Sequence, residues 1–317
     1  MSAESDYLVD RKGLRRKLGF WRAIAFVVAI AAVVGIGFAV SGRAGGGLAQ
    51  NHIARVDISG FITGDQKTIE LLERVGKGRA RAVIVQVDSP GGTVSGSERL
   101  FTALRELSEK KPTVALVRGL AASGGYLAAM GAERIVAQET SIVGSIGVLF
   151  QVPNVSRLLD TVGVRMETVK SAPLKASPNP FEPTTPAAEA AIQALVTSNF
   201  EWFRRIVSDR RGLAGEPLAK VTDGRIFTGQ QALDLKLVDE IGGEKQAVAW
   251  LEREKGVDKG LPIREWKRST TTEFNLWSAA AAVSEAAGLD GLARVLQSAG
   301  RGIEQPSLDG LLAVWQP

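Results

Sequence analysis

Cysteine is absent from this sequence of 317 residues, and histidine occurs once, as His52. Without cysteine the chain cannot form disulfides, use a thiolate as nucleophile or bind a metal through sulfur. A single histidine excludes a histidine-rich metal site, and we expect neither a metal nor a cofactor. A Ser-His-Asp triad would depend on His52, which directly precedes the first predicted strand and which we expect to be a solvated linker residue.

Basic charge is concentrated at the N-terminus. The formal net charge is +5, and the first 22 residues carry six basic and three acidic side chains, so the rest of the chain is nearly neutral. This distribution argues against nucleic acid as a partner. The next segment, Ala23 to Val40, carries no charge. At ~1.5 Å per residue it spans about 27 Å, close to the ~30 Å hydrocarbon core of a bilayer, and we expect a transmembrane anchor.

Basic residues before an apolar segment predict that the N-terminus stays in the cytoplasm and that the body of the protein is exported. The alternative is a cleaved signal peptide, for which Gly47-Leu48-Ala49 is a passable cleavage site. We favour a retained anchor. The predicted organisation is a basic N-terminus (residues 1–22), an anchor (23–41), a linker (42–52), a main domain (53–258) and a C-terminal tail (259–317).

Strand-like and helical segments alternate through the main domain. The predicted strands are 53–62, 81–88, 113–117, 134–137, 164–169 and 237–241, and the predicted helices are 66–75, 98–110, 126–130, 154–162, 185–211 and 245–255. This alternation predicts βαβ crossovers, a parallel sheet and an α/β fold. Apart from a candidate strand at 261–266, the tail lacks this alternation of strands and helices. We expect weak helices there that either pack on a neighbouring subunit or are mobile.

Ser123 follows a predicted buried strand and precedes a glycine pair and a helical segment. A serine at such a junction exposes its hydroxyl beside the next backbone N–H, as a nucleophile requires. The alternative is a serine that caps the helix. The segment Ser89-Pro90-Gly91-Gly92 follows a neighbouring strand and is expected to turn, which leaves N–H groups unpaired. Gly92 and Gly124 are therefore candidate donors of an oxyanion hole.

A serine nucleophile needs a base, and without a usable histidine the known alternative is lysine. The ordinary pKa of lysine, about 10.4, must fall by several units for this role, and burial lowers it because desolvation disfavours the ammonium. Lys175 suits the role because Pro173 and Pro178 stiffen its loop and its immediate neighbours are apolar. Lys170, at the end of a predicted strand, is the competitor and is expected to be solvated.

Five blocks of the sequence resemble the signal peptide peptidase A family, in the same order and at similar spacing. The blocks are Val87–Gly92, Ala121–Tyr126, Gly144–Val148, Lys170-Ser171 with Lys175, and Asp223–Arg225. The resemblance covers residues 50–255 approximately and is closest to the short bacterial form. It implies a Clp-protease/crotonase-like fold and a serine protease with a Ser/Lys dyad.

Carried onto this chain, the resemblance implies that Ser123 is the nucleophile, Lys175 the general base and Ser145 a hydroxyl that orients the lysine amine. Gly92 and Gly124 would be the oxyanion donors. The resemblance also implies a homo-oligomeric ring or dome, with an octamer favoured. Its expected location is the bacterial inner or cell membrane, with a single span and the catalytic domain on the exported side.

The implied function is degradation of cleaved signal peptides and other unfolded apolar segments. One alternative is a related membrane protease that acts on a specific membrane protein. Another is a crotonase-type acyl-CoA-binding or scaffold protein without peptidase activity. An exported location argues against the acyl-CoA alternative, because coenzyme A is cytosolic. The combination of Ser123 with Lys175 also argues against it.

Overall fold

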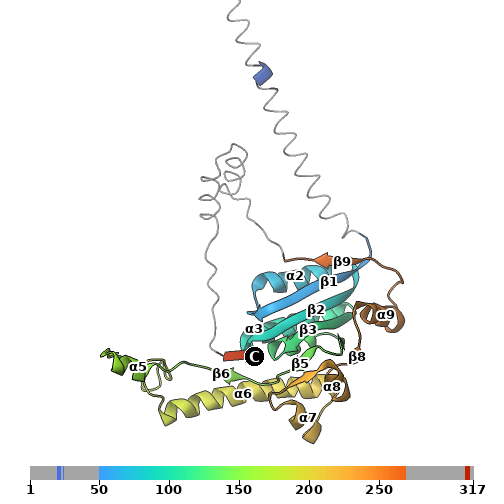
Figure 1. The fold of residues 1–317 in the computed structure, drawn as a ribbon. Helices are drawn as coiled ribbons and strands as arrows, with labels where there is room; N and C mark the ends of the chain where they lie inside the picture. The colour runs from blue at the N-terminus through green and yellow to red at the C-terminus, as the bar shows by residue number, and fades with distance from the viewer. Residues whose placement is uncertain (1–19, 23, 25–49, 269–310, 315–317) are drawn as a thin grey trace, which may run out of the picture. The chain divides into compact units, whose positions relative to one another are not determined.

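The computed structural model describes residues 20–22, 24, 50–268 and 311–314. Contacts within the chain divide it into two units, residues 1–51 and 52–317, and the second contains the sheet (Figure 1). The predicted anchor at 23–41 lies outside the described residues, except for Ile24. In the ranges that the structure describes, no helix combines the length and the apolar character needed to cross a membrane.

A sheet of mostly parallel strands forms the centre of the second unit (Figure 1). The parallel neighbours are, in order, β9 (Ile263–Trp266), β1 (His52–Ile62), β2 (Ala80–Thr93), β3 (Thr113–Ala122), β4 (Arg134–Ala137) and β8 (Glu240–Ile241). The short β5 (Ile142–Gly144) runs parallel to the last residues of β3. The expected α/β architecture with a parallel sheet is therefore confirmed, and it fits a Clp-protease-like fold.

Three short strands complete the sheet. β7 (Ile226–Thr228) is antiparallel to β5, and β10 (Leu311–Val314) is antiparallel to both β2 and β6 (Leu149–Phe150). β9 lies within the candidate strand predicted at 261–266, whereas β10 lies where the sequence predicts a tail of weak helices. The tail residues 269–310 lie outside the described part of the chain.

The central strands are buried on both faces. Side chains on a strand alternate between faces, so Val83 and Val85 of β2 join one apolar cluster while Ala82 and Ile84 join another. The first cluster includes residues of α2 (Gln66–Lys77), α3 (Val94–Lys110), α4 (Gly124–Ala129) and α6 (Pro186–Arg211). The second includes residues of α9 (Glu244–Glu254). The remaining helices are α5 (Ser156–Thr161), α7 (Gly215–Val221) and α8 (Gly229–Asp234).

β2 is longer than predicted. The sequence predicts a turn at Ser89-Pro90-Gly91-Gly92, but these residues continue the strand to Thr93, and Gly92 pairs with Ile62 of β1. The prediction is wrong here because β1 offers pairing partners beyond the proline. Thr93 then caps α3, accepting a hydrogen bond from the N–H of Gly96 at 3.0 Å.

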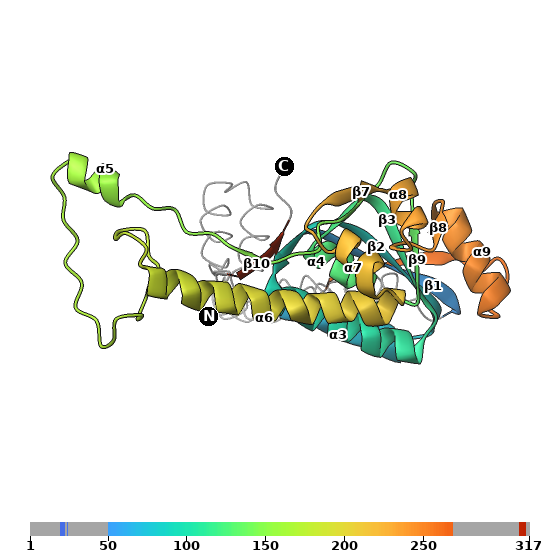
Figure 2. The ribbon, with the colours of Figure 1, turned by 90° about the horizontal axis from the view of Figure 1, so that it is seen from below.

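Residues 151–185, which connect β6 to α6, form an arm that extends away from the sheet (Figures 1 and 2). The strand predicted at 164–169 is absent, because no neighbouring strand pairs with this segment among the described residues, and its apolar side chains are exposed. α6 is likewise buried only in part. Phe203 and Val207, near its C-terminus, lie in the core, whereas Leu195 is exposed.

Candidate active site

Ser123 occupies the single residue between β3 and α4. Its φ is 54°, a left-handed value that is rare outside glycine. The hydroxyl does not cap α4, so the alternative interpretation of Ser123 as a capping serine is not supported. Ser123 is only 1% exposed, so the prediction of an exposed hydroxyl is wrong for the single chain. Its Oγ donates a long, and therefore weak, hydrogen bond of 3.5 Å to the carbonyl oxygen of Gly147.

The strained backbone of Ser123 is held from several sides. Its N–H donates to the carbonyl of Gly144 at 2.7 Å. A β-carbon at Gly125 would lie 2.5 Å from the carbonyl oxygen of Ser89, so only glycine fits there. Tyr126 is fully buried and donates its hydroxyl to the carbonyl of Leu237 at 2.7 Å. Burial raises the pKa of Tyr126 well above its usual range, so the phenol stays protonated.

Ser145 lies beside Ser123. β3 and β5 pair Ala122 with Gly144, so the residues that follow, Ser123 and Ser145, leave neighbouring strands at the same edge. Ser145 is also left-handed, with φ 51°, and its N–H donates to the carbonyl of Arg225 at 2.8 Å. The Asp223-Gly224-Arg225 block thus supports the backbone of Ser145.

The two oxyanion candidates lie at the ends of neighbouring strands. Gly124 directly follows Ser123, and Gly92 lies three residues beyond Ser89, which pairs with Ala121 of β3. A β-carbon at Gly92 would lie 1.8 Å from the carbonyl oxygen of Ile62, so the close approach of β1 requires glycine. This edge of the sheet therefore carries Ser123, Ser145 and both glycines.

Lys175 lies apart from this cluster. It lies on the arm and is exposed, whereas Ser123 is buried, and within the described residues its amine forms no hydrogen bond or ion pair. A single chain thus places the candidate base away from its own candidate nucleophile.

Lys170, the competing lysine, is engaged elsewhere on the arm. Its amine donates to the carboxylate of Glu182 and, at 2.8 Å, to the hydroxyl of Ser177. Glu182 also accepts from Ser177 at 2.8 Å and from Asn179 at 2.7 Å. The Lys170 ammonium lowers the pKa of the Glu182 carboxyl, with Ser177 adding to the effect. Lys170 is therefore largely buried in an ion pair rather than solvated, and it braces the loop that carries Lys175.

His52 is not a solvated linker residue, contrary to the prediction. It is fully buried as the first residue of β1, stacks on Trp266 at 5.9 Å between ring centroids and accepts a hydrogen bond from the indole N–H at 2.9 Å. The sequence hides this contact because the partners are far apart along the chain. His52 pairs with Ala80 at the start of β2, whereas Ser123 follows the end of β3, so the two residues lie at opposite ends of the sheet.

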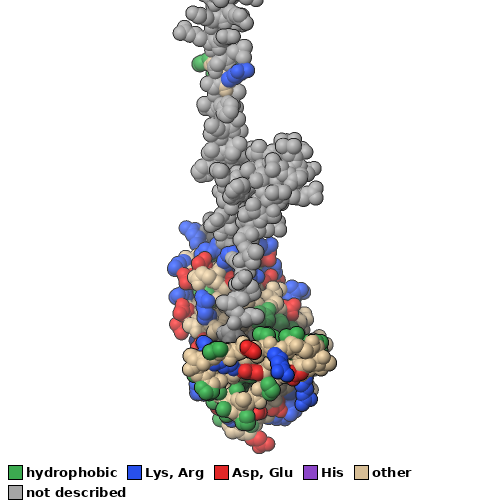
Figure 3. All heavy atoms as spheres, turned by 90° about the vertical axis from the view of Figure 1, so that its left-hand side faces the viewer, with side chains coloured by type: hydrophobic (Ala, Val, Ile, Leu, Met, Phe, Trp, Pro, Cys, Tyr) green, Lys and Arg blue, Asp and Glu red, His purple; other side chains and the backbone are tan. Residues whose placement is uncertain are grey.

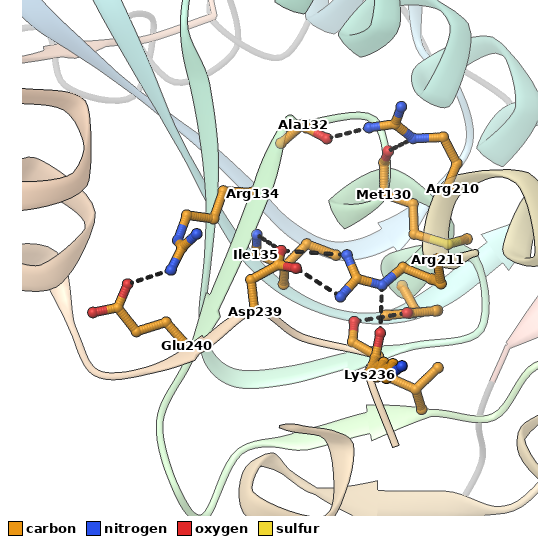
Figure 4. A network of polar contacts seen from close by, with 11 residues as sticks. Met130, Ala132, Arg134, Ile135, Arg210, Arg211, Lys236, Asp239 and Glu240 are labelled. Atoms are coloured by element: carbon orange, nitrogen blue, oxygen red, sulfur yellow. Dashed lines mark hydrogen bonds and ion pairs between the residues drawn. The ribbon is translucent and has the colours of Figure 1, made fainter. Parts of the chain in front are cut away.

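Two arginines at the end of α6 connect this helix to the segment that follows α4 and to the segment that carries Asp239 (Figure 4). Arg210 donates to the carbonyls of Met130 and Ala132, at 2.9 and 2.7 Å, just after α4 ends. Arg211 donates to the carbonyl of Lys236 at 2.6 Å and to the Asp239 carboxylate at 2.8 Å. These contacts of Arg210 and Arg211 were not predicted from the sequence, where their only signal is the pair of adjacent arginines.

This edge of the sheet carries the Ser123 hydroxyl together with Gly124, the next residue, and Gly92 of the neighbouring strand. Acyl transfer by a serine nucleophile requires a hydroxyl beside backbone N–H donors. Within the described residues, no group of three or more His, Asp or Glu side chains is placed to hold a metal ion.

Comparison with known proteins identifies the family. Residues 105–258 match the model of peptidase family S49. The chain is 40% identical over 211 residues to "Putative protease slr0021" of Synechocystis, covering 66% of this chain and 76% of that protein. It is 30% identical over 246 residues to "Putative signal peptide peptidase SppA" of Enterococcus faecium, covering 73% and 71%. It is also 30% identical over 191 residues to "Protease 4" of Salmonella typhi, covering 60% and 31%. The chain therefore belongs to peptidase family S49, the SppA family, and is a serine peptidase of the SppA and protease 4 type.

Proposed function

We propose that this serine peptidase is a membrane-anchored endopeptidase in which Ser123 is the nucleophile and Lys175 the general base. Its substrates are cleaved signal peptides and other unfolded apolar segments. The observation that supports the proposal is the conformation and place of Ser123. Its φ is left-handed and its hydroxyl does not cap α4. It lies at the edge of the sheet where the parallel strands end at their C-terminal residues. A strained residue that the surrounding structure holds in place is typical of a functional site.

In the proposed reaction, the neutral amine of Lys175 takes the proton from Ser123 Oγ as the oxygen attacks the scissile carbonyl carbon. The N–H groups of Gly92 and Gly124 donate to the resulting oxyanion, each contributing roughly 3 kcal/mol to transition-state stabilisation. The protonated lysine passes its proton to the leaving amine. Water then attacks the acyl carbon while the lysine amine takes a proton from it. The bond from the acyl carbon to Ser123 Oγ breaks, the lysine returns the proton to Oγ, and the peptide leaves as a carboxylic acid. Ser145, beside Ser123, orients the lysine amine.

The position of Lys175 supports a homo-oligomer. A lysine on an arm that leaves its own sheet can reach the serine of another copy. The arm also carries exposed apolar side chains, some of which are visible in Figure 3. They are Leu158, Val162, Val164, Met166, Val169, Leu174 and Phe181. Apolar surface of this extent favours burial against a partner. We therefore propose a ring or dome, with an octamer favoured, in which each site takes Ser123 from one copy and Lys175 from the next.

Membrane attachment and substrate class rest on sequence. The uncharged segment 23–40 after a basic N-terminus supports a retained anchor and an exported catalytic domain in the bacterial inner or cell membrane. The E. faecium relative is named a signal peptide peptidase, which supports remnant signal peptides as substrates. Such peptides are apolar and unfolded, so they can present an extended backbone to a strand edge.

A fluorophosphonate probe, which reacts with activated serines, tests the nucleophile. We expect labelling of the wild-type chain and none of Ser123→Ala. Ser171→Ala, which alters an exposed serine of the arm, is the matched control and should label normally. Persistent labelling of a folded Ser123→Ala protein would refute the assignment.

A further inference from the structure

The pairing of β2 with β3 changes register just before Ser123. Val87 pairs with Val117, and the next pair is Ser89 with Ala121. Between these two pairs β2 advances by two residues and β3 by four, so β3 contains two extra residues at this point. An irregularity of this kind shifts every later residue of one strand relative to its neighbour.

This shift sets the position of the two candidate oxyanion donors relative to each other. Gly92 and Gly124 each lie three residues beyond the last pair of β2 with β3. With the earlier register maintained, Gly92 would correspond to Ala122, two residues before Gly124. Donors of an oxyanion hole must converge on one oxygen, so the extra residues of β3 matter for their alignment.

The side chain of Asp88 holds the widened part of β3. Its Oδ1 accepts a hydrogen bond of 3.1 Å from the N–H of Leu120. A β-carbon at Gly119 would lie 3.1 Å from the same oxygen, so the carboxylate packs against the backbone of this segment. Because Asp88 is exposed, removing its carboxylate leaves the apolar core intact.

Ser89 holds a second irregularity, between β1 and β2. From the pair of Ser59 with Asp88 to the next pair, β1 advances by two residues and β2 by three. The Ser89 hydroxyl is fully buried, donates to the carbonyl of Gly60 at 2.7 Å and accepts from the N–H of Gly91 at 3.1 Å. Gly60 and Gly91 have positive φ values of 72° and 113°, which glycine adopts readily. Ser89 thus ties both strands together directly before the oxyanion candidate of β2.

We propose that Asp88 and Ser89 are positioning residues of the oxyanion hole. Their side chains maintain the register that directs the N–H groups of Gly92 and Gly124 to one oxyanion, and neither side chain touches the substrate. This inference rests on the proposed roles of Ser123 and the two glycines, and it adds the residues that hold them in place.

Loss of a positioning contact should affect the transition state more than the bound substrate. Oxyanion donors bind most strongly where charge develops, and a displacement of about 1 Å costs on the order of 10²-fold in rate. A variant that loosens the register should therefore lower kcat and leave KM nearly unchanged.

Variants of the exposed Asp88 test the proposal without disturbing the core. We expect Asp88→Ala to lower kcat for a reporter peptide by about 10- to 100-fold, with KM within about two-fold of wild type. Asp88→Asn keeps an oxygen that can accept from Leu120, so its kcat should stay within about three-fold of wild type. Asp57→Ala removes an exposed carboxylate of the neighbouring β1 and is the matched control, which should behave as wild type.

A peptide aldehyde separates positioning from general damage. Its adduct with Ser123 places an oxygen in the oxyanion hole, whereas the corresponding peptide alcohol forms no adduct. In Asp88→Ala we expect the Ki of the aldehyde to rise by about the factor by which kcat falls, with the Ki of the alcohol unchanged. Partial unfolding would reduce the number of active sites and alter neither constant.

Ser89→Ala should show the same pattern, because it removes the hydroxyl that ties β1 to β2. Ser97→Ala is its matched control. Ser97 is a fully buried serine of α3 whose hydroxyl has no hydrogen-bond partner among the described residues, so kcat and both Ki values should match wild type.

A wild-type kcat in Asp88→Ala would overturn the proposal. So would a fall in kcat without a matching rise in the Ki of the aldehyde, or an Asp88→Asn variant as impaired as Asp88→Ala. Failure of the proposed function gives a different result. In that case the wild-type chain itself shows no labelling by fluorophosphonate that depends on Ser123.

Discussion

At the scale of single residues, backbone conformation separates Ser123 and Ser145 from the other serines that the structure describes. Ser123 and Ser145 both have left-handed φ values, and they lie side by side because β3 and β5 end in register. A left-handed non-glycine residue costs on the order of 1–3 kcal/mol, which neighbouring contacts must offset. The buried Tyr126 and the close packing of Gly125 on Ser89 provide such contacts.

The two lysines of the arm should respond differently to mutation. We expect Lys175→Ala to lower kcat/KM by about 10²- to 10⁴-fold, the range for loss of a general base. Because Lys175 is exposed, this substitution should change the free energy of unfolding of the protein by less than about 0.5 kcal/mol. Lys170→Ala removes a brace rather than the base, and we expect an activity loss of about ten-fold at most. Equal losses, measured with one reporter peptide, would contradict the assignment of Lys175.

Tyr126 supports α4, the helix that follows Ser123, through one buried hydrogen bond to the carbonyl of Leu237. Tyr126→Phe leaves this carbonyl without its side-chain donor, so we expect the free energy of unfolding to fall by about 1–3 kcal/mol. Chemical denaturation measures the change. A stability equal to wild type would show that the hydroxyl contributes nothing to holding α4.

At the scale of elements, α6 links two parts of the site. Its C-terminal residues Arg210 and Arg211 hold the loop after α4 and the segment that carries Asp239, while its N-terminus continues into the arm (Figures 2 and 4). Thr185 caps the helix by accepting from the N–H of Ala188, and Gly212 ends it with φ 64°. The arm is therefore attached to the sheet through a helix whose C-terminal end is held beside α4.

The ion pair of Lys170 with Glu182 makes the arm sensitive to acid. The pKa of Glu182 is lowered in the folded protein, so its carboxylate stabilises the arm fully above the ordinary value of 4.5. This contribution is lost as the pH falls through the lowered pKa. We expect faster amide hydrogen exchange in residues 170–182 below about pH 4.5, after correction for the intrinsic rate.

Glu182→Gln should abolish this acid response and show fast exchange in the arm already at neutral pH. Glu189→Gln, which changes a carboxylate on the first turn of α6, is the matched control and should behave as wild type. An acid response that survives in Glu182→Gln would place its origin elsewhere.

At the scale of the whole molecule, each copy carries both parts of the proposed dyad but keeps them apart. Ser123 is buried at the edge of the sheet, and Lys175 is exposed on the arm. A subunit-sharing arrangement predicts complementation between two inactive variants. Mixing Ser123→Ala and Lys175→Ala chains in equal amounts during assembly should restore roughly a quarter of wild-type activity. Half of the sites receive an intact Ser123 and half receive an intact Lys175, so about a quarter of the sites receive both.

The complementation is measured with a reporter peptide after co-expression. Each variant expressed alone is the control and should be inactive. No recovery in a mixed assembly of normal size would show that serine and lysine come from one copy.

Local patterns in the sequence determined much of the fold, namely the buried strands of the sheet, most helices and the strand-to-helix junction at Ser123, because periodicity and glycine placement act over a few residues. Only the tertiary structure decided the rest. In the folded protein β2 continues through Pro90, and His52 is buried against Trp266. Residues 164–169 stay unpaired on the arm, and β10 pairs with Gly92. Each of these outcomes depends on a partner far away in the chain, or on the lack of one, and no local pattern of residues records which distant segment comes to lie alongside.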